Sequence, residues 1–314
     1  MKKNIKQPNI ISDIQHDPYI GKALKIIVVS LILFFACDAV IGIFLTKGLE
    51  RYYGLGNNAE IALVGHSHLM LGVDKTHLEN ELGVPVAKYT REGVNIGDRQ
   101  IMIRQLLQRN ANLKLVIYGV DAWSFTGEGL SANSYALFYP FMDDKTVNDY
   151  VKQQTTFSNY WIHKLLKTSR FNEGLISSSF RGYLKNWTNL KIGEVDTERL
   201  KKQIAAGNFR KISNSQTNID ILRKTISELN QRNIKVVLLY VPTIDLYNQA
   251  EPQKFNETLE ILQQIADDFE SVSLFNYLEP WSHDYTLFFD PIHMNPKGQK
   301  LVTEKLIKDL EDEQ

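Results

Sequence analysis

Apolar residues follow two different patterns along this chain. The first is a nearly unbroken apolar run over residues 26–45, long enough to cross a hydrocarbon core of about 30 Å as a helix. The second is an alternation of short apolar runs with amphipathic stretches, which begins near residue 61 and resumes near residue 218. The two patterns predict one membrane-spanning helix followed by an α/β domain.

The short apolar runs have the length and composition of buried strands, and the stretches between them have helical periodicity. Strands that alternate with helices predict a parallel sheet covered on both faces. We expect a three-layer α/β/α fold of the flavodoxin-like kind, with about five strands. The expected strands cover residues 61–64, 84–89, 113–120, 235–241 and 272–275. The expected helices cover residues 97–110, 218–231, 252–268 and 296–310.

The alternation is interrupted over about residues 122–215, a stretch rich in aromatic side chains. Because a structureless loop of this length is uncommon in a domain, we expect a helical insertion over the sheet edge, with helices near residues 145–154 and 159–166. Its aromatic residues could stack on sugars, form a lid or contact a membrane partner. They could equally form the core of the extra helices, since aromatic side chains bury large areas whatever their function.

The flanks of the apolar run indicate an uncleaved anchor. Five lysines precede it and no small-residue cleavage site follows it. The positive-inside rule then predicts a cytoplasmic tail (1–25), a transmembrane helix (26–46) and an extracytoplasmic domain (60–314). A buried core helix is the alternative. Asp38 lies inside the run, where an ionisable group is costly, so we expect it to meet a partner or to lie near the interface.

Composition narrows the function classes. The chain has 314 residues, with 36 basic and 36 acidic side chains and zero formal charge, so we expect no broad attraction to nucleic acid. Cys37 is the single cysteine, which rules out an intrachain disulfide.

Two short stretches, far apart in the sequence, carry candidate chemistry. Ser67 follows the first expected strand in the segment Gly65-His66-Ser67-His68, and open α/β folds place ligands at such strand ends. Near the C-terminus, Asp290 stands three residues before His293, so that one loop could deliver a base and the carboxylate that orients it. A serine, a histidine and an aspartate are the parts of an activated nucleophile.

Other interpretations of these residues remain open. A serine at the end of a strand is often only a turn residue. The loop before the last helix could serve to cap that helix through Asn295. His66 and His68 are two residues apart and could bind a metal together with Asp290 or His293, although we expect no metal because no third ligand has a clear spacing.

Four segments in order resemble the blocks of SGNH (GDSL-type) hydrolases over roughly residues 61–310, except for the middle insertion. The most specific is Asp-Pro-Ile-His-x-Asn-x-x-Gly, at residues 290–298. The others are Gly65-x-Ser67, Gly97-Asp98 and Gly119-x-Asp121. With its single N-terminal anchor, the chain is most similar to membrane-bound envelope members of that superfamily, the D-alanyl transfer (DltD-type) and polysaccharide O-acetylation proteins. Those proteins work beside a multi-spanning membrane acyltransferase.

The resemblance implies roles for particular residues. Ser67 would be the nucleophile, His293 the general base and then acid, and Asp290 the group that orients His293. The backbone N–H groups of Ser67 and Gly97 would belong to the oxyanion hole.

Two departures from the family pattern matter. His66 stands where Asp is usual, and we expect His66 and His68 to support the site or to pack beside it. Asp121 stands where an Asn donor is usual. A carboxylate would repel the oxyanion unless protonated, and losing one donor typically costs about 10²–10³ in rate. Asn95 is a candidate substitute.

These observations lead to three hypotheses. The first is an anchored, cofactor-independent serine O-acyltransferase or esterase that modifies a cell-envelope polysaccharide or another acyl ester at the bacterial cytoplasmic membrane. The resemblance implies a multi-pass membrane acyltransferase as its partner. The second is a catalytically silent SGNH-like protein that binds glycan or assembles a membrane complex. The third is a metal-dependent hydrolase that uses His66 and His68.

Overall fold

The computed structural model describes residues 18–126 and 133–313, and it contains a five-stranded parallel sheet in the order β2-β1-β3-β4-β5. This order and the flanking helices confirm the expected three-layer α/β fold, consistent with an SGNH-like domain. The strands are β1 (Ile61–Gly65), β2 (Val86–Thr90), β3 (Leu115–Val120), β4 (Lys235–Tyr240) and β5 (Val272–Asn276).

Successive side chains along a strand point to opposite faces of the sheet, and they belong to two separate hydrophobic cores, one on each face. On β1, Ala62 and Val64 belong to the first core, and Ile61 and Leu63 belong to the second. The first core is covered by α5 (Ile96–Arg109), α10 (Gln216–Asn230) and α12 (Pro252–Asp267). The second is covered by α3 (Ser67–Gly72), α4 (Lys75–Leu82) and α13 (Pro296–Asp312). The long helices match the expected ones closely, whereas α3 and α4 were not predicted.

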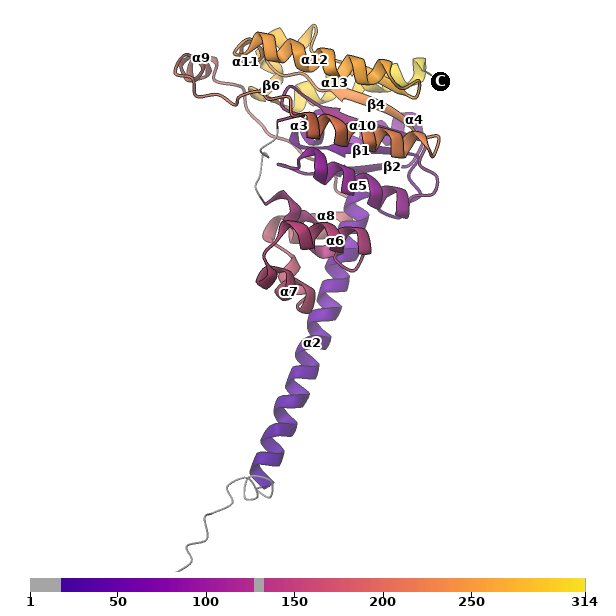
Figure 1. Ribbon diagram of the computed structural model, residues 1–314, viewed down its shortest axis with the longest axis vertical. Helices are drawn as coiled ribbons and strands as arrows, with labels where there is room; N and C mark the ends of the chain where they lie inside the picture. Colours follow the sequence, from indigo (N-terminus) through magenta and orange to yellow (C-terminus); the bar gives the residue numbers. More distant parts are fainter. Residues whose placement is uncertain (1–17, 127–132, 314) are drawn as a thin grey trace, which may run out of the picture.

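The chain between β3 and β4 forms a group of short helices, which we call the helical segment. In Figure 1, α6, α7 and α8 lie together beside the upper half of the long helix α2, below the sheet. The expected helices at 145–154 and 159–166 are present as α6 and α7. The elements of this segment are η1 (Ser134–Phe141), α6 (Lys145–Gln154), α7 (Phe157–Leu165), η2 (Thr168–Arg170), α8 (Glu173–Tyr183) and α9 (Thr197–Ala205). Residues 127–132 of the proposed insertion lie outside the described residues.

Helix α2 (Pro18–Tyr53) continues well beyond the apolar run and enters the domain. It is long and apolar enough to span a membrane. Every described residue from 19 to 37 is exposed, and the first buried one is Asp38. Residues 1–17 of the expected cytoplasmic tail lie outside the described residues.

Asp38 finds its partners within its own chain. Its carboxylate accepts hydrogen bonds from the backbone N–H of Lys167 at 2.7 Å and of Thr168 at 2.9 Å, and from the Thr168 hydroxyl at 2.5 Å. These donors belong to the start of η2. The polar position in the apolar run is therefore where α2 docks on the helical segment, and no second membrane protein is needed to pair it.

The docking continues where α2 crosses α8 at small residues. A Cβ built at Gly182 would overlap the carbonyl oxygen of Gly48 and lie 2.8 Å from the backbone nitrogen of Tyr52. The Ser179 hydroxyl donates a hydrogen bond to the Leu45 carbonyl at 2.8 Å. The two backbones approach this closely only because glycine has no side chain.

A buried lysine makes stability depend on pH. The ammonium of Lys88 donates hydrogen bonds to the carbonyls of Met70 (2.8 Å) and Val73 (2.6 Å) at the end of α3. Burial lowers the pKa of Lys88 to about 7, against the opposing attraction of Asp74, whereas an unfolded lysine titrates near ~10.4. Between these values the unfolded chain binds more protons, so this group makes the free energy of unfolding rise with pH.

We therefore expect the free energy of unfolding of the natural protein, measured relative to that of Lys88→Met, to rise by at least ~1 kcal/mol from pH 7 to pH 9. Urea unfolding in detergent micelles, followed by tryptophan fluorescence, measures it. A difference that stays constant over this range would show that Lys88 keeps its proton in the folded state.

Candidate active site

Ser67 stands at the point where the sheet reverses its strand order. It follows β1 by two residues and opens α3, while β2 and β3 pair with β1 on opposite sides. In open α/β sheets such switch points form the crevice in which ligands bind. His66 caps α3, because its Nδ1 accepts a hydrogen bond from the backbone N–H of His68 at 3.1 Å. The histidine in the usual Asp position thus performs the capping that a carboxylate would perform.

The C-terminal loop is shaped by a small antiparallel hairpin that the sequence pattern did not predict. Strands β6 (Phe288–Asp290) and β7 (His293–Met294) pair with each other. Asp290 Oδ1 closes the turn by accepting the backbone N–H groups of Ile292 and His293, both at 3.0 Å. This leaves Oδ2 free to meet the imidazole of His293 at 2.7 Å. The spacing of three residues therefore lets one carboxylate fix both the loop and the ring.

The structure brings the two distant stretches together. His293 Nε2 lies 2.7 Å from Ser67 Oγ, across 226 positions of sequence. A carboxylate can only accept hydrogen bonds, so the contact with Asp290 places the ring proton on Nδ1 and leaves Nε2 as the acceptor for the serine hydroxyl. The side chains of His293 and Asp290 are 12% and 32% exposed, which leaves the group accessible from solvent. This is the geometry of an activated serine.

Asp290 is held as an anion. Burial by itself would raise the pKa of its carboxyl, but the hydrogen bonds from His293 and from the backbone N–H groups of Ile292 and His293 outweigh it and lower the pKa below the ordinary value. A carboxylate that stays charged can keep the His293 tautomer and stabilise an imidazolium beside it.

Both histidines beside Ser67 are buried against Asp121, which directly follows β3. His66 Nε2 contacts Asp121 Oδ2, and His68 Nδ1 lies 3.2 Å from the same oxygen. The His68 and His293 rings are edge to face, with centroids 5.3 Å apart. The second carboxylate oxygen, Oδ1, accepts from the Trp123 N–H and the Ser124 hydroxyl. The two histidines therefore connect the site to a buried anion, and neither faces open solvent.

The electrostatics of this cluster are set by burial. Burial lowers the pKa of His66, and burial together with the neighbouring His66 lowers the pKa of His68 well below its ordinary value. Burial would raise the pKa of Asp121, but its contacts with His66 and His68 hold that pKa well below the ordinary range. We conclude that an anionic Asp121 faces two neutral imidazoles.

His66, His68 and Asp121 are also a group that could hold a metal. Their three facing atoms are all buried, lie within 4.8 Å of one another and lack an aligned hydrogen bond. Against this, Nδ1 of His66 accepts a backbone N–H, so a neutral ring carries its proton on Nε2, the atom that a cation would need. The donor set therefore fits a buried His–Asp–His contact better than a metal centre. Asp290 and His293, the partners considered from the sequence, are engaged with each other.

Three of the four residues expected at the oxyanion hole lie at the starts of two helices. Ser67 and Gly97 lie in the first turns of α3 and α5, where backbone N–H groups have no intrahelical partner, and neither N–H has a partner among the described residues. Asn95 caps α5: its Oδ1 accepts the Asp98 N–H at 2.9 Å, while Asp98 accepts the Asn95 N–H. The carboxylate of Asp121 contacts the two histidines, in the place where the resemblance implies an Asn donor. The role of each in an oxyanion hole stays a prediction.

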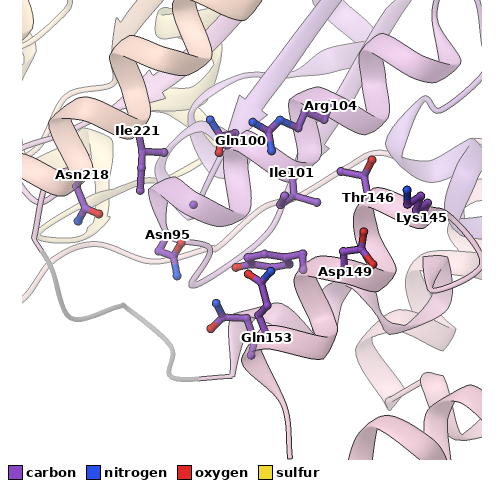
Figure 2. A pocket seen from close by; sticks show the side chains of 13 residues that line it. Asn95, Gln100, Ile101, Arg104, Lys145, Thr146, Asp149, Gln153, Asn218 and Ile221 are labelled. Carbon is purple, nitrogen blue, oxygen red and sulfur yellow. The ribbon is translucent and has the colours of Figure 1, made fainter.

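A polar cavity of about 680 Å³ begins beside the second helix start (Figure 2). It runs from Asn95 and Gly97 between α5, α6 and α10. The sequence analysis did not single out its lining, because the residues come from elements far apart in the chain. Amide and charged side chains dominate the lining, namely Gln100, Arg104, Lys145, Asp149, Gln153, Gln154 and Asn218.

Comparison with known proteins finds only solved structures of low similarity to this chain. No family model matches the chain, and no curated protein matches it. A solved structure from Streptococcus pneumonia, provisionally described as a platelet activating factor, aligns with a TM-score of 0.42 and 12% identity over 91% of this chain and 98% of its own. An acylhydrolase from Bacteroides fragilis NCTC 9343, also provisionally assigned, aligns with a TM-score of 0.39 and 10% identity over 80% and 86%. Similarities this distant carry no functional argument, which rests on the site itself.

Proposed function

We propose that this chain is a membrane-anchored serine acyl-ester enzyme of the SGNH type. The observation that carries the proposal is the continuous contact from Ser67 Oγ to His293 Nε2, and from His293 Nδ1 to Asp290, each at 2.7 Å. If Ser67 were only a turn residue and the loop of Asp290 and His293 only capped a helix, nothing would require these three side chains to contact one another in this order.

The geometry supports a two-step reaction. As Ser67 Oγ attacks an acyl ester, His293 Nε2 takes the hydroxyl proton and then donates it to the departing alkoxide, which leaves an acyl-enzyme. In the second step His293 removes a proton from water or from an acceptor hydroxyl, which attacks the acyl-enzyme. His293 then returns that proton to Ser67 Oγ as the acyl group leaves it. The N–H groups of Ser67 and Gly97 are the candidate donors to the oxyanion in both steps.

The acceptor that we propose is a hydroxyl of a cell-envelope glycan. Support comes from the polar cavity beside Gly97, whose amide, carboxylate and cationic side chains suit a polyhydroxylated ligand. Because an acceptor held there would compete with water, transfer would win over hydrolysis when the cavity is occupied. Acetyl or a similarly small group is the proposed acyl unit.

The anchor supports a location at the bacterial cytoplasmic membrane. Helix α2 is apolar and exposed up to residue 37, and the lysines before it favour a cytoplasmic N-terminus with the domain outside. We propose a multi-pass membrane acyltransferase as the partner that delivers the acyl group, as the resemblance to envelope proteins implies.

A fluorophosphonate probe tests the nucleophile directly. The natural protein is expected to become labelled, and Ser67→Ala is expected to lose all labelling because no other hydroxyl contacts His293 among the described residues. Ser213→Ala, at an exposed serine, is the matched control and should label normally. Labelling that persists in Ser67→Ala would remove Ser67 from this role.

The catalytically silent alternative is favoured by one observation, the buried carboxylate of Asp121. Its negative charge stands beside the histidines that flank Ser67, where the resemblance leads one to expect an amide donor. Hydrolysis of p-nitrophenyl acetate by the natural protein, lost in Ser67→Ala, would exclude this alternative. A complete lack of turnover with an intact Ser67–His293 contact would favour it.

A further inference from the structure

The position of Asp38 limits how α2 can lie in a membrane. Residues 26–37 are twelve residues between Lys25 and Asp38, and at 1.5 Å per residue they span about 18 Å. A hydrocarbon core of about 30 Å needs about 20 residues. With Lys25 at the cytoplasmic boundary, the core must extend about eight residues past Asp38, into the part of α2 that already contacts the domain.

The outer face of α2 remains apolar over that same distance. Val40 is 67% exposed, and Ile41 and Ile43 are each 49% exposed. The opposite face is covered, since Asp38 meets η2 and Gly42 touches Lys167. One face is therefore suited to lipid while the other carries the helical segment, so the segment should share the bilayer with α2.

Helix α7 presents a matching apolar face. Phe157, Trp161 and Leu165, spaced by four residues, are 81%, 45% and 64% exposed, and Ile162 between them is 49% exposed. Residues four apart share one side of a helix, and apolar patches of this kind on soluble surfaces mark interaction sites. In Figure 1, α7 is the lowest of the short helices beside the upper half of α2, on the side of the domain from which the anchor extends.

The polar residues near α7 agree with a membrane interface. Lys164 of α7 donates to the Met142 carbonyl and to the Asn148 side chain, and Lys167, just before η2, pairs with Asp143, so both ammonium groups have polar partners within the protein. Phe, Trp and Leu on one face with lysine on the other is the composition of helices that lie in the plane of the interface.

We propose that α7 and η2 lie in the outer leaflet, with the apolar face of α7 buried at the boundary between headgroups and acyl chains. This inference rests on the proposed anchoring. It explains why Asp38 is tolerated in the apolar run: its carboxylate is already paired with backbone and hydroxyl donors of η2, as a polar group inside a bilayer must be. The catalytic domain would then be fixed to the membrane by two elements rather than suspended on one helix.

The depth of single nitroxide labels tests this arrangement. The full chain with Cys37→Ala carries one cysteine at a time, Leu165→Cys on α7, Leu31→Cys in the free part of α2 or Glu260→Cys on α12, in vesicles of phosphatidylethanolamine and phosphatidylglycerol. Collision with oxygen and with a water-soluble nickel complex reports depth. We expect the label at Leu165 to lie roughly 5–10 Å inside the headgroup boundary, the one at Leu31 to lie in lipid as well, and the one at Glu260 to lie in water.

The other outcomes separate the two proposals. A label at Leu31 in water would overturn the anchoring. If the label at Leu31 lies in lipid and the one at Leu165 lies in water, only the present inference is overturned. The outer boundary of the hydrocarbon core would then lie at Asp38, and Lys22 and Lys25 would reach back to the cytoplasmic surface. A label at Leu165 shielded from both reagents would overturn it in favour of a protein partner on α7.

Tryptophan fluorescence gives a second measurement without a cysteine label. Trp161 is exposed on α7, whereas Trp123 is buried in the domain. Lipids brominated near the headgroup should quench part of the natural emission, and Trp161→Phe should remove that quenched part. Quenching that is unchanged in Trp161→Phe would overturn the inference.

Discussion

His293→Ala is expected to lower kcat/KM for an acyl ester by about 10³-fold or more, because it removes both the base and the later acid. Asp290→Asn should lose about 10²–10⁴-fold while the ring stays in place, since an amide no longer holds the proton on Nδ1. Hydrolysis of p-nitrophenyl acetate by each purified variant in detergent measures both effects. The pKa of Asp290 lies below its ordinary value, so we expect its carboxylate to stay charged and its protonation to cause no loss of activity above about pH 5.

The chain offers a matched control for this experiment. His283 also contacts a carboxylate, Asp245, at 3.0 Å, but its side chain is 58% exposed and it contacts no serine. His283→Ala should therefore leave kcat/KM unchanged. Equal losses in the His283 and His293 variants would mean that the loss reflects folding, and full activity in His293→Ala would refute the proposed mechanism.

Gly182→Ala is expected to disrupt the docking of α8 on α2. The added Cβ would collide with the Gly48 carbonyl and the Tyr52 backbone nitrogen, and neither backbone atom can move aside as a flexible side chain could. Overpacking of this kind typically costs about 1–3 kcal/mol, which corresponds to a fall of roughly 3–10 °C in Tm for a domain of this size. Thermal unfolding of the purified protein in detergent micelles measures the fall.

Gly21→Ala is the corresponding control on the same long helix. Within the described part of the chain, no atom lies within 4 Å of a Cβ built there, and alanine favours helix more than glycine does. We expect its Tm to be unchanged or slightly higher. If Gly182→Ala were as stable as Gly21→Ala, the close crossing of α2 and α8 would not exist in solution.

Much of the fold could be predicted because local pattern and tertiary role agree in the sheet. Strands such as β1 and β3 are buried on both faces, so they appear in the sequence as continuous apolar runs. Helices such as α5 and α12 carry one apolar face and were predicted to within one or two residues. The short helix α3 was missed, because six residues are too few to show a helical period.

The sequence alone determined the parts of the candidate site that are local. The spacing of Asp290 and His293 predicted one loop that carries both groups. The apolar run before Ser67 predicted a strand that ends beside it, and so a serine at the edge of the sheet. Only the tertiary structure decided the rest. It placed Ser67 against His293, joined Asp121 to two histidines, and paired Asp38 with η2 within the same chain. The physical reason is that strand order, and the docking of one helix on another, depend on contacts between residues far apart in the chain, which no local period of apolar residues records.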